Sequence, residues 1–171
     1  LPLMASASIA VSSLSMDGTI DDETLRFTLA FDAVASVADA EIPLLSSDSV
    51  LEELPTGKGW RVRFDPQRDM YLLHIDEPNV AASISTVFVT RSKVYDEEPT
   101  WGQVSLVIPD AQVRTMKVVV NDPELAVELP GALQLDTIPT DTSLTATGVL
   151  PPQKPCRIRW QTSIEIVEEA E

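Results

Sequence analysis

The sequence has few of the residues from which common catalytic and metal-binding sites are built. Its 171 residues include one cysteine, Cys156, and one histidine, His74. A single cysteine excludes an intrachain disulfide, and a single histidine excludes a zinc site with several histidines. The motifs H-E-x-x-H, G-x-S-x-G, G-x-x-x-x-G-K and G-x-G-x-x-G do not occur, so zincin, hydrolase, phosphate-loop and dinucleotide chemistry have no anchor. The residues alone therefore assign no catalytic, cofactor-binding or metal-binding position.

Positive charge is also scarce. Twelve Lys and Arg face 27 Asp and Glu, for a formal net charge of −15. Such a field repels phosphate backbones and anionic lipids, which argues against nucleic-acid or peripheral membrane binding. Cationic partners and divalent cations are electrostatically permitted, and the charge also keeps a β-rich protein soluble.

Long apolar runs are missing as well. No stretch approaches the ~20 residues that a membrane-spanning helix needs. The opening residues Leu1–Met4 have neither a basic region nor an apolar core, so they do not form an intact signal peptide. Because the chain begins with leucine, we expect a mature or trimmed product.

Proline, in contrast, is abundant and regularly placed. Ten of the 13 prolines punctuate the chain between Pro43 and Pro151, separating short stretches rich in Val, Ile, Leu and Thr. Proline is excluded from helix interiors and central strand positions, so this spacing favours many short strands. Only the windows 32–41 and 47–54 leave room for a turn or two of helix, and neither would organise the fold.

Alternation of apolar and polar residues predicts where the strands lie. The clearest strand is 24–34, residues 60–75 read as a hairpin, and a further strand covers 83–90. Later strands are expected at the following ranges: 103–108, 115–120, 125–129, 143–147, 156–161 and 163–167. A charged, turn-like segment at 92–100 suggests a boundary between units 1–95 and 96–171, although one continuous domain is also compatible. The predicted fold is all-β, with two packed antiparallel sandwich units of immunoglobulin-like or jelly-roll-like type and little helix.

Four features are candidates for chemistry, and each has a simpler structural interpretation. His74 is expected to be a solvent-facing or hydrogen-bonded strand residue rather than a base, because no partner is evident. Cys156 precedes Arg157, whose charge favours a thiolate, but a half-buried cysteine at a strand start is the simpler interpretation. The acidic segment 17–23 departs from the EF-hand pattern, so a solvated hairpin loop is favoured over a calcium site. The tryptophans at 60, 101 and 160 are expected to pack in the core rather than to form a sugar platform.

The second half resembles a known kind of sequence. The order of its segments is a strand ending in Ile-Pro, a Val-rich strand, a Pro-Gly turn, a Pro-Pro step and an Arg-x-Arg-Trp strand. These segments are 103–109, 115–120, 125–132, 150–152 and 157–160. The first half, in which 40–45 leads into a hairpin, is similar to the segment that usually precedes such an order. This order resembles tandem β-sandwich segments of large exported or membrane-anchored bacterial proteins of uncharacterised function.

The resemblance implies a non-enzymatic extracytoplasmic module and transfers no active-site residue. The expected role is structural: protein interaction or self-association within a larger exported or membrane-anchored assembly, through strand edges or loop ends. An alternative remains open, a carbohydrate-binding or calcium-dependent accessory domain of a hydrolase. An enzyme with paired acidic residues is a third possibility, but nothing in the sequence selects a pair. A subunit with a fixed place in a large assembly is a fourth.

Overall fold

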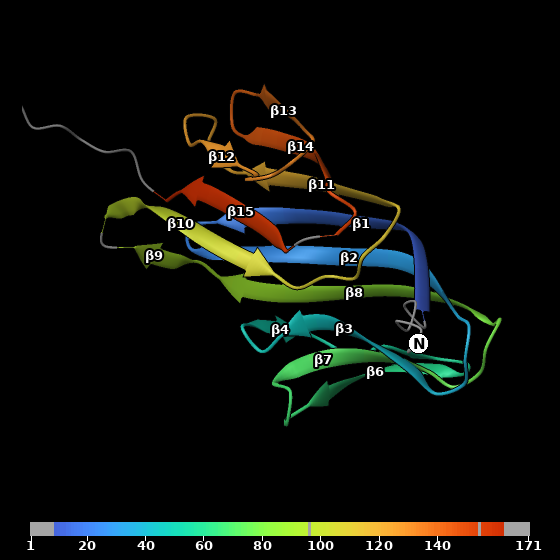
Figure 1. The fold of residues 1–171 in the computed structure, drawn as a ribbon. Coiled ribbons are helices and arrows are strands. Elements are labelled where there is room, and N and C mark those ends of the chain that lie inside the picture. Colours follow the sequence, from blue (N-terminus) through green and yellow to red (C-terminus); the bar gives the residue numbers. More distant parts are fainter. Residues whose placement is uncertain (1–8, 96, 154, 163–171) are drawn as a thin grey trace, which may run out of the picture.

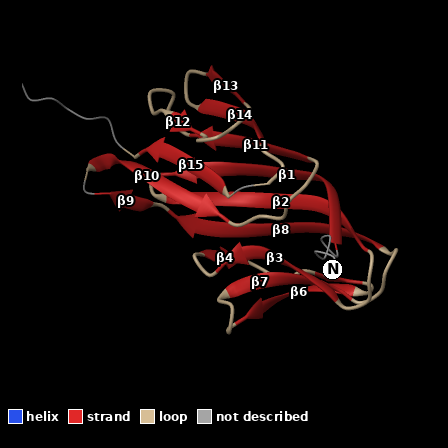
Figure 2. Cartoon of the chain, in the orientation of Figure 1, coloured by secondary structure: helices blue, strands red, loops and turns tan. Residues whose placement is uncertain are grey.

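A computed structural model describes residues 9–95, 97–153 and 155–162, all as strands, turns and loops (Figures 1 and 2). No helix occurs in these ranges, so none of them contains a helix that could cross a membrane. The all-β prediction is confirmed. The windows 32–41 and 47–54, considered for short helical turns, contain strand residues joined by turns and bends instead. The strand predicted at 163–167 lies outside the described residues.

The largest sheet has seven strands in the order β13-β14-β11-β1-β2-β8-β4. Its strands are β1 (Ile9–Asp21), β2 (Thr24–Ala35), β4 (Ser49–Leu51), β8 (Ala81–Arg91), β11 (Val113–Val120), β13 (Gln134–Pro139) and β14 (Leu144–Leu150). The sheet takes strands from both sides of the expected boundary at 92–100. The pair β1–β11 joins the two groups and is parallel, while the other pairs are antiparallel. The division into units 1–95 and 96–171 stays a prediction.

Two four-stranded sheets complete the fold. We name each after one of its central strands. The β7 sheet has the order β3-β7-β6-β5, and the β10 sheet has the order β12-β15-β10-β9. Their strands are β3 (Ala40–Ser46), β5 (Thr56–Gly57), β6 (Trp60–Asp65), β7 (Met70–Ile75), β9 (Lys93–Tyr95), β10 (Glu98–Leu106), β12 (Val127–Glu128) and β15 (Cys156–Gln161). The predicted hairpin at 60–75 is therefore confirmed as β6–β7.

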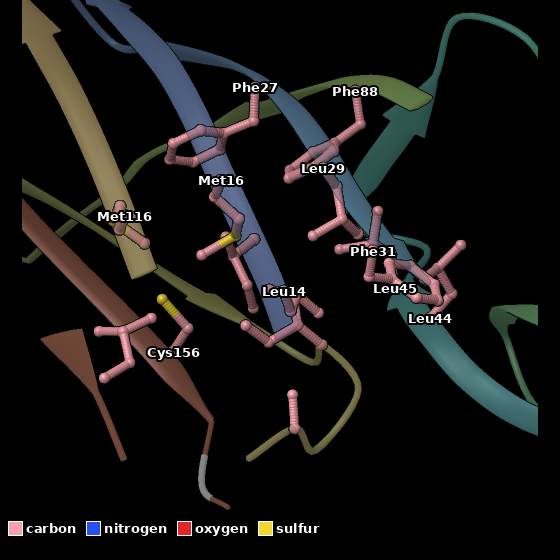
Figure 3. Packing of buried hydrophobic residues seen from close by; sticks show 14 of the residues in the cluster. Leu14, Met16, Phe27, Leu29, Phe31, Leu44, Leu45, Phe88, Met116 and Cys156 are labelled. Carbon is pink, nitrogen blue, oxygen red and sulfur yellow. The ribbon is translucent and has the colours of Figure 1, made fainter. Parts of the chain in front are cut away.

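One hydrophobic core joins the three sheets. Alternation in the large sheet puts Met16, Leu29 and Met116 on one face in matching register. In Figure 3, Leu44 and Leu45 of β3 lie beside Phe31, whereas Cys156 of β15 lies near Met116. The two smaller sheets therefore supply side chains to different parts of this core.

The opposite face of the large sheet is polar and solvent-exposed. It carries short side chains such as Ser15, Thr19 and Ser85, which alternate with the buried positions. A shallow hollow of about 530 Å³ lies over β1 and β2 and is lined partly by Asp17 and Arg26. This face is a solvated surface on which charged side chains such as Asp17 and Arg26 alternate with short polar ones.

Candidate functional site

Three polar side chains form a row across the β7 sheet. Glu41 of β3 pairs in register with His74 of β7, and His74 pairs with Arg61 of β6. Leu73 and Ile75, on either side of His74, are buried in the core. Since successive strand residues point to opposite faces, the row lies on the face turned away from the core. It brings together residues from three separate strands.

Two aspartates extend this row at the end of the sheet. Asp39 precedes β3, Asp76 follows β7, and the backbone N–H of Asp39 donates to the carbonyl of Asp76 at 3.0 Å. Asp39 adopts a left-handed conformation, with φ of 51°. The carboxylates of both residues converge on one imidazole nitrogen: His74 Nε2 lies 3.3 Å from Asp39 Oδ1 and 3.2 Å from Asp76 Oδ1.

The other side of the imidazole faces a third carboxylate. His74 Nδ1 is buried and lies 3.3 Å from Glu41 Oε2, without the alignment of a formed hydrogen bond. Arg63 of β6 donates to the same oxygen through Nε at 3.0 Å and Nη2 at 2.6 Å. Burial raises the pKa of the Glu41 carboxyl, but Arg63 and His74 together outweigh burial, so this pKa is lowered overall. Glu41 is therefore held as a carboxylate beside His74.

Arg61 competes with His74 for the carboxylate of Asp76. Its Nη1 lies 3.1 Å from Asp76 Oδ1, the oxygen that also faces His74. About half of each side chain is exposed in this pair, at 48 % and 44 %. An ion pair so accessible to water is weak, and Arg61 is free to exchange it for solvent.

The sequence-based interpretation of His74 as a hydrogen-bonded strand residue is confirmed, because its Nε2 is in hydrogen-bond contact with Asp39. The sequence did not reveal the carboxylates around it. Asp39 and His74 are 35 positions apart, and only the β3–β7 pairing brings them together. The sequence offered one indication of this site: the alternation at 70–75 places His74 on the face opposite to Leu73 and Ile75.

The acidic segment 17–23 is arranged differently from the expected loop. Residues 17–21 belong to β1, and only Asp22 and Glu23 form the turn to β2. Among the described residues, the one group of three potential metal ligands close together is Asp39, His74 and Asp76. Only the end of the segment 17–23 is therefore a hairpin loop. Among the described residues, its carboxylates do not form a group of three close metal ligands.

The three tryptophans do not share a surface. Trp160 is fully buried in the core, and its Nε1–H donates to the carbonyl of Asp22 at 2.8 Å. Trp60 is half-buried in the β7 sheet and packs against Gly57, where an added Cβ would lie 2.1 Å from the indole nitrogen. Trp101 belongs to the β10 sheet, with the guanidinium of Arg159 5.0 Å from its ring centroid. The expected core packing is confirmed for Trp160, and Trp60 packs against the core, whereas Trp101 is partly buried outside the core cluster.

Cys156 is a core residue. Its side chain is buried, and burial raises the pKa of the thiol to about 12, although the nearby charge of Arg114 acts in the opposite direction. Arg114 is itself buried and donates through Nε to the carbonyl of Pro151 at 2.6 Å. A thiol with so high a pKa is protonated at neutral pH, so Cys156 is a packing residue and no activated nucleophile.

A second charged cluster lies on the β10 sheet. Arg159 of β15 pairs with Glu98 and with Glu128, whose Oε2 lies 2.9 Å from Nη1. The same guanidinium stacks over Trp101. Arginine has no free lone pair, so this cluster neutralises charge but offers no nitrogen ligand to a metal ion.

Comparison with known proteins gives a structural relationship without a family. No protein-family model and no curated protein matches the sequence. The M1 zinc metallopeptidase from Deinococcus radiodurans matches over 90 % of this chain and 42 % of its own, with a TM-score of 0.59 and 10 % identity. What is shared is a fold.

Two further solved structures give the same result. A mutant of an M1 zinc metallopeptidase from Deinococcus radiodurans, bound to a Tyr-Ser-Ala substrate, matches 93 % of this chain and 44 % of its own, with a TM-score of 0.55 and 12 % identity. A two-domain M1 zinc metallopeptidase mutant bound to L-tryptophan matches 94 % and 44 %, with a TM-score of 0.57 and 10 % identity. The chain thus spans less than half the length of the matched proteins. Of the resemblance to tandem β-sandwich segments, these matches support the β-sandwich fold and no family.

Proposed function

We propose that this chain is a non-enzymatic β-sandwich module that acts through protein contacts within a larger protein or assembly. The observation that carries the proposal is the asymmetry of the structural matches. Between 90 % and 94 % of this chain is matched, but only 42–44 % of each metallopeptidase chain. A fold that recurs as one part of longer proteins is suited to a supporting role beside other domains.

The composition of the chain supports the absence of peptidase chemistry. The zincin motif H-E-x-x-H needs two histidines, and His74 is alone in the sequence. The buried thiol of Cys156 offers no replacement nucleophile. The module therefore has the scaffold of part of a metallopeptidase without that motif.

The edge of the large sheet supplies a surface for protein contacts. β13 is paired on one side only, with β14, and its residues are exposed throughout. Leu133 and Ile138 are 68 % and 64 % exposed, which places apolar surface next to unpaired backbone groups. A net charge of −15 repels a second copy, so the proposal favours a different polypeptide as partner. The proposal retains the extracytoplasmic location expected from the sequence resemblance.

The test is the state of the protein in its source cells. We expect a tagged chain at its natural expression level to migrate in a complex much heavier than 18.7 kDa on native mass measurement. Purified protein should show no hydrolysis of amino-acid amides or peptides, with or without added zinc. A free monomer would contradict the proposed assembly, and turnover that survives repurification would contradict the non-enzymatic role.

A second measurement addresses the alternative of a calcium-dependent or carbohydrate-binding domain. We expect the melting temperature to be unchanged by calcium or by soluble sugars. Trp160 is buried, and the one cluster of three acidic or histidine ligands among the described residues includes an imidazole nitrogen, which calcium does not favour. A concentration-dependent rise with either ligand would favour the alternative.

A further inference from the structure

The environment of His74 has more acceptors than the imidazole has protons. Three carboxylate oxygens, from Asp39, Glu41 and Asp76, lie within 3.3 Å of its two ring nitrogens. A neutral imidazole has one N–H and one lone pair, and even the imidazolium has only two N–H groups. One contact between nitrogen and oxygen is therefore left without a proton in every protonation state.

The two sides of the ring are not equivalent. Glu41 on the Nδ1 side is neutralised by Arg63, which makes two hydrogen bonds to its Oε2. On the Nε2 side, Asp39 has a side chain 78 % exposed and Asp76 is shared with the accessible Arg61. The uncompensated negative charge therefore gathers around Nε2, where a bound cation would be stabilised.

The spacing of the atoms around Nε2 fits a small metal ion. Zinc binds imidazole nitrogen and carboxylate oxygen at about 2.0–2.2 Å, and two ligands of a tetrahedral ion at such distances are about 3.3 Å apart. The distances from Nε2 to the aspartate oxygens are 3.3 and 3.2 Å, and all three ligand atoms lie within 4.8 Å of one another. Little movement is needed to place one ion in contact with all three.

We propose that Asp39, His74 and Asp76 form a binding site for a divalent transition metal ion of the zinc class. His74 binds through Nε2, each aspartate contributes one oxygen, and water occupies the remaining position. When the ion binds, Glu41, whose Oε2 lies 3.3 Å from Nδ1, accepts the Nδ1 proton and so keeps the Nε2 lone pair directed at the ion, in the way that carboxylates orient metal-bound histidines. Arg61 is a competitor that leaves Asp76 when the metal binds. This site does not depend on the proposed assembly role.

The donor set favours zinc over calcium and magnesium. An imidazole nitrogen with two carboxylates suits a borderline ion, whereas calcium requires six to eight oxygens and magnesium an octahedral set of mostly oxygen ligands. Cobalt(II) accepts similar ligands to zinc and absorbs visible light in a tetrahedral site, so it reports coordination directly.

The first experiment is titration of the full chain with zinc and cobalt(II), with calcium as a comparison ion. We expect saturable binding of one zinc per chain and a cobalt(II) spectrum with tetrahedral intensity. Asp39→Asn should weaken binding at least 10-fold without unfolding the protein, because Asp39 is exposed and asparagine tolerates its positive φ. Glu77→Gln removes the same charge next to Asp76 and serves as the matched control, with affinity changed less than 3-fold.

Two further variants separate ligation from general electrostatics. Glu41→Gln should weaken zinc binding by about 10- to 100-fold, the usual effect of losing a carboxylate that orients a ligating histidine. Arg61→Met should strengthen binding, since it removes the competing cation from Asp76. If Arg61→Met weakens binding, Arg61 holds Asp76 in place rather than competing with the metal ion, and if Asp39→Asn and Glu77→Gln have equal effects, zinc is held by diffuse surface charge. Either result contradicts the proposal.

The second experiment uses the fact that His74 is the only histidine. A nitrogen-15 spectrum therefore contains a single imidazole. We expect zinc to shift the Nε2 resonance while Nδ1 stays protonated. An imidazolium spectrum that zinc leaves unchanged would show that a proton, rather than a metal ion, compensates the carboxylates, and would overturn the site.

Discussion

The β7 sheet and the β10 sheet both carry a cationic or basic side chain between carboxylates, but the chemistry of the two clusters differs. In the β10 sheet the central group is Arg159, between Glu98 and Glu128. In the β7 sheet it is His74, with Asp39 and Asp76 on one nitrogen and Glu41 near the other. A guanidinium is permanently charged and only donates, whereas an imidazole also has a lone pair. The same strand pairing therefore gives a neutralising network in one sheet and a potential ligand set in the other.

The inner faces of the two sheets differ in a related way. The β10 sheet contributes Trp160, Cys156 and Ile158 to the core, all almost fully buried. In the β7 sheet, Trp60 remains half-buried, and Phe64 is exposed by more than a third. We therefore expect the β10 sheet to contribute more to the stability of the fold, and the β7 sheet to tolerate changes at its surface.

The strongest test of this difference exchanges the two tryptophans for alanine. Trp160→Ala should lower the free energy of unfolding by about 3–5 kcal/mol, since it removes a buried ring and leaves a cavity. Trp60→Ala should cost about half as much, because part of its ring is already in water. Chemical denaturation measures both values. Equal losses would show that the two sheets contribute equally to stability, contrary to the difference in burial described above.

A control separates packing from hydrogen bonding at Trp160. Trp160→Phe keeps an aromatic ring but loses the N–H that donates to the Asp22 carbonyl at 2.8 Å. We expect a cost of about 1–3 kcal/mol for the carbonyl left without its partner. A loss as large as that of Trp160→Ala would mean that the hydrogen bond, and not ring volume, dominates.

The burial of Cys156 predicts slow thiol chemistry and a loss of stability at high pH. The folded thiol has a pKa of about 12 against an ordinary value of 9.0, so the unfolded chain releases its proton first as the pH rises. The contribution of this group is therefore complete below about pH 9 and is lost progressively toward about pH 12. Cys156→Ala should flatten this part of the stability profile.

Reaction with a thiol reagent gives an independent measure. For an unfolding free energy of about 5 kcal/mol, the labelling of Cys156 should be slower than that of a free thiol by more than about a thousandfold. Rapid labelling under native conditions would indicate that the core opens locally around β15. The β10 sheet would then not be the more stable of the two sheets, contrary to our expectation.

Substitution of Arg159 should have a smaller effect. Arg159→Met removes two ion pairs and the stacking over Trp101 but retains an apolar stem. We expect a loss of about 1 kcal/mol, and the difference from the unchanged protein should shrink as salt is added. A loss that does not depend on salt would assign the effect to packing against Trp101 rather than to charge.

The smallest effect is expected at Arg61. Arg61→Met removes a pair in which both side chains are about half exposed, so the free energy of unfolding should change by less than about 0.5 kcal/mol. Thermal or chemical denaturation in metal-free buffer tests this value. A larger loss would mean that Arg61 is needed to hold Asp76 and that the β7 cluster is a structural ion-pair network.

Local sequence patterns predicted several elements well. The strand at 24–34 and the hairpin at 60–75 follow from strict alternation, and the structure places them as β2 and β6–β7. β1 was missed, although Leu14, Met16 and Ile20 do alternate. Its Asp17-Gly18 step resembles a turn, but Gly18 is in mid-strand because an added Cβ would lie 2.2 Å from Phe27 Cδ1. A register shift between Val11 and Leu14 further breaks the pattern.

The sequence by itself determined that the chain forms short strands, that it has no multi-histidine or nucleophile motif, and which residues of each clear strand face the core. These properties depend on neighbouring residues, since proline and the period of two act locally. Only the tertiary structure decided that β1 pairs in parallel with β11 and that Asp39 and Asp76 meet at His74. Contacts between distant segments depend on which strands pair and how the sheets share one core, and no local pattern encodes that choice.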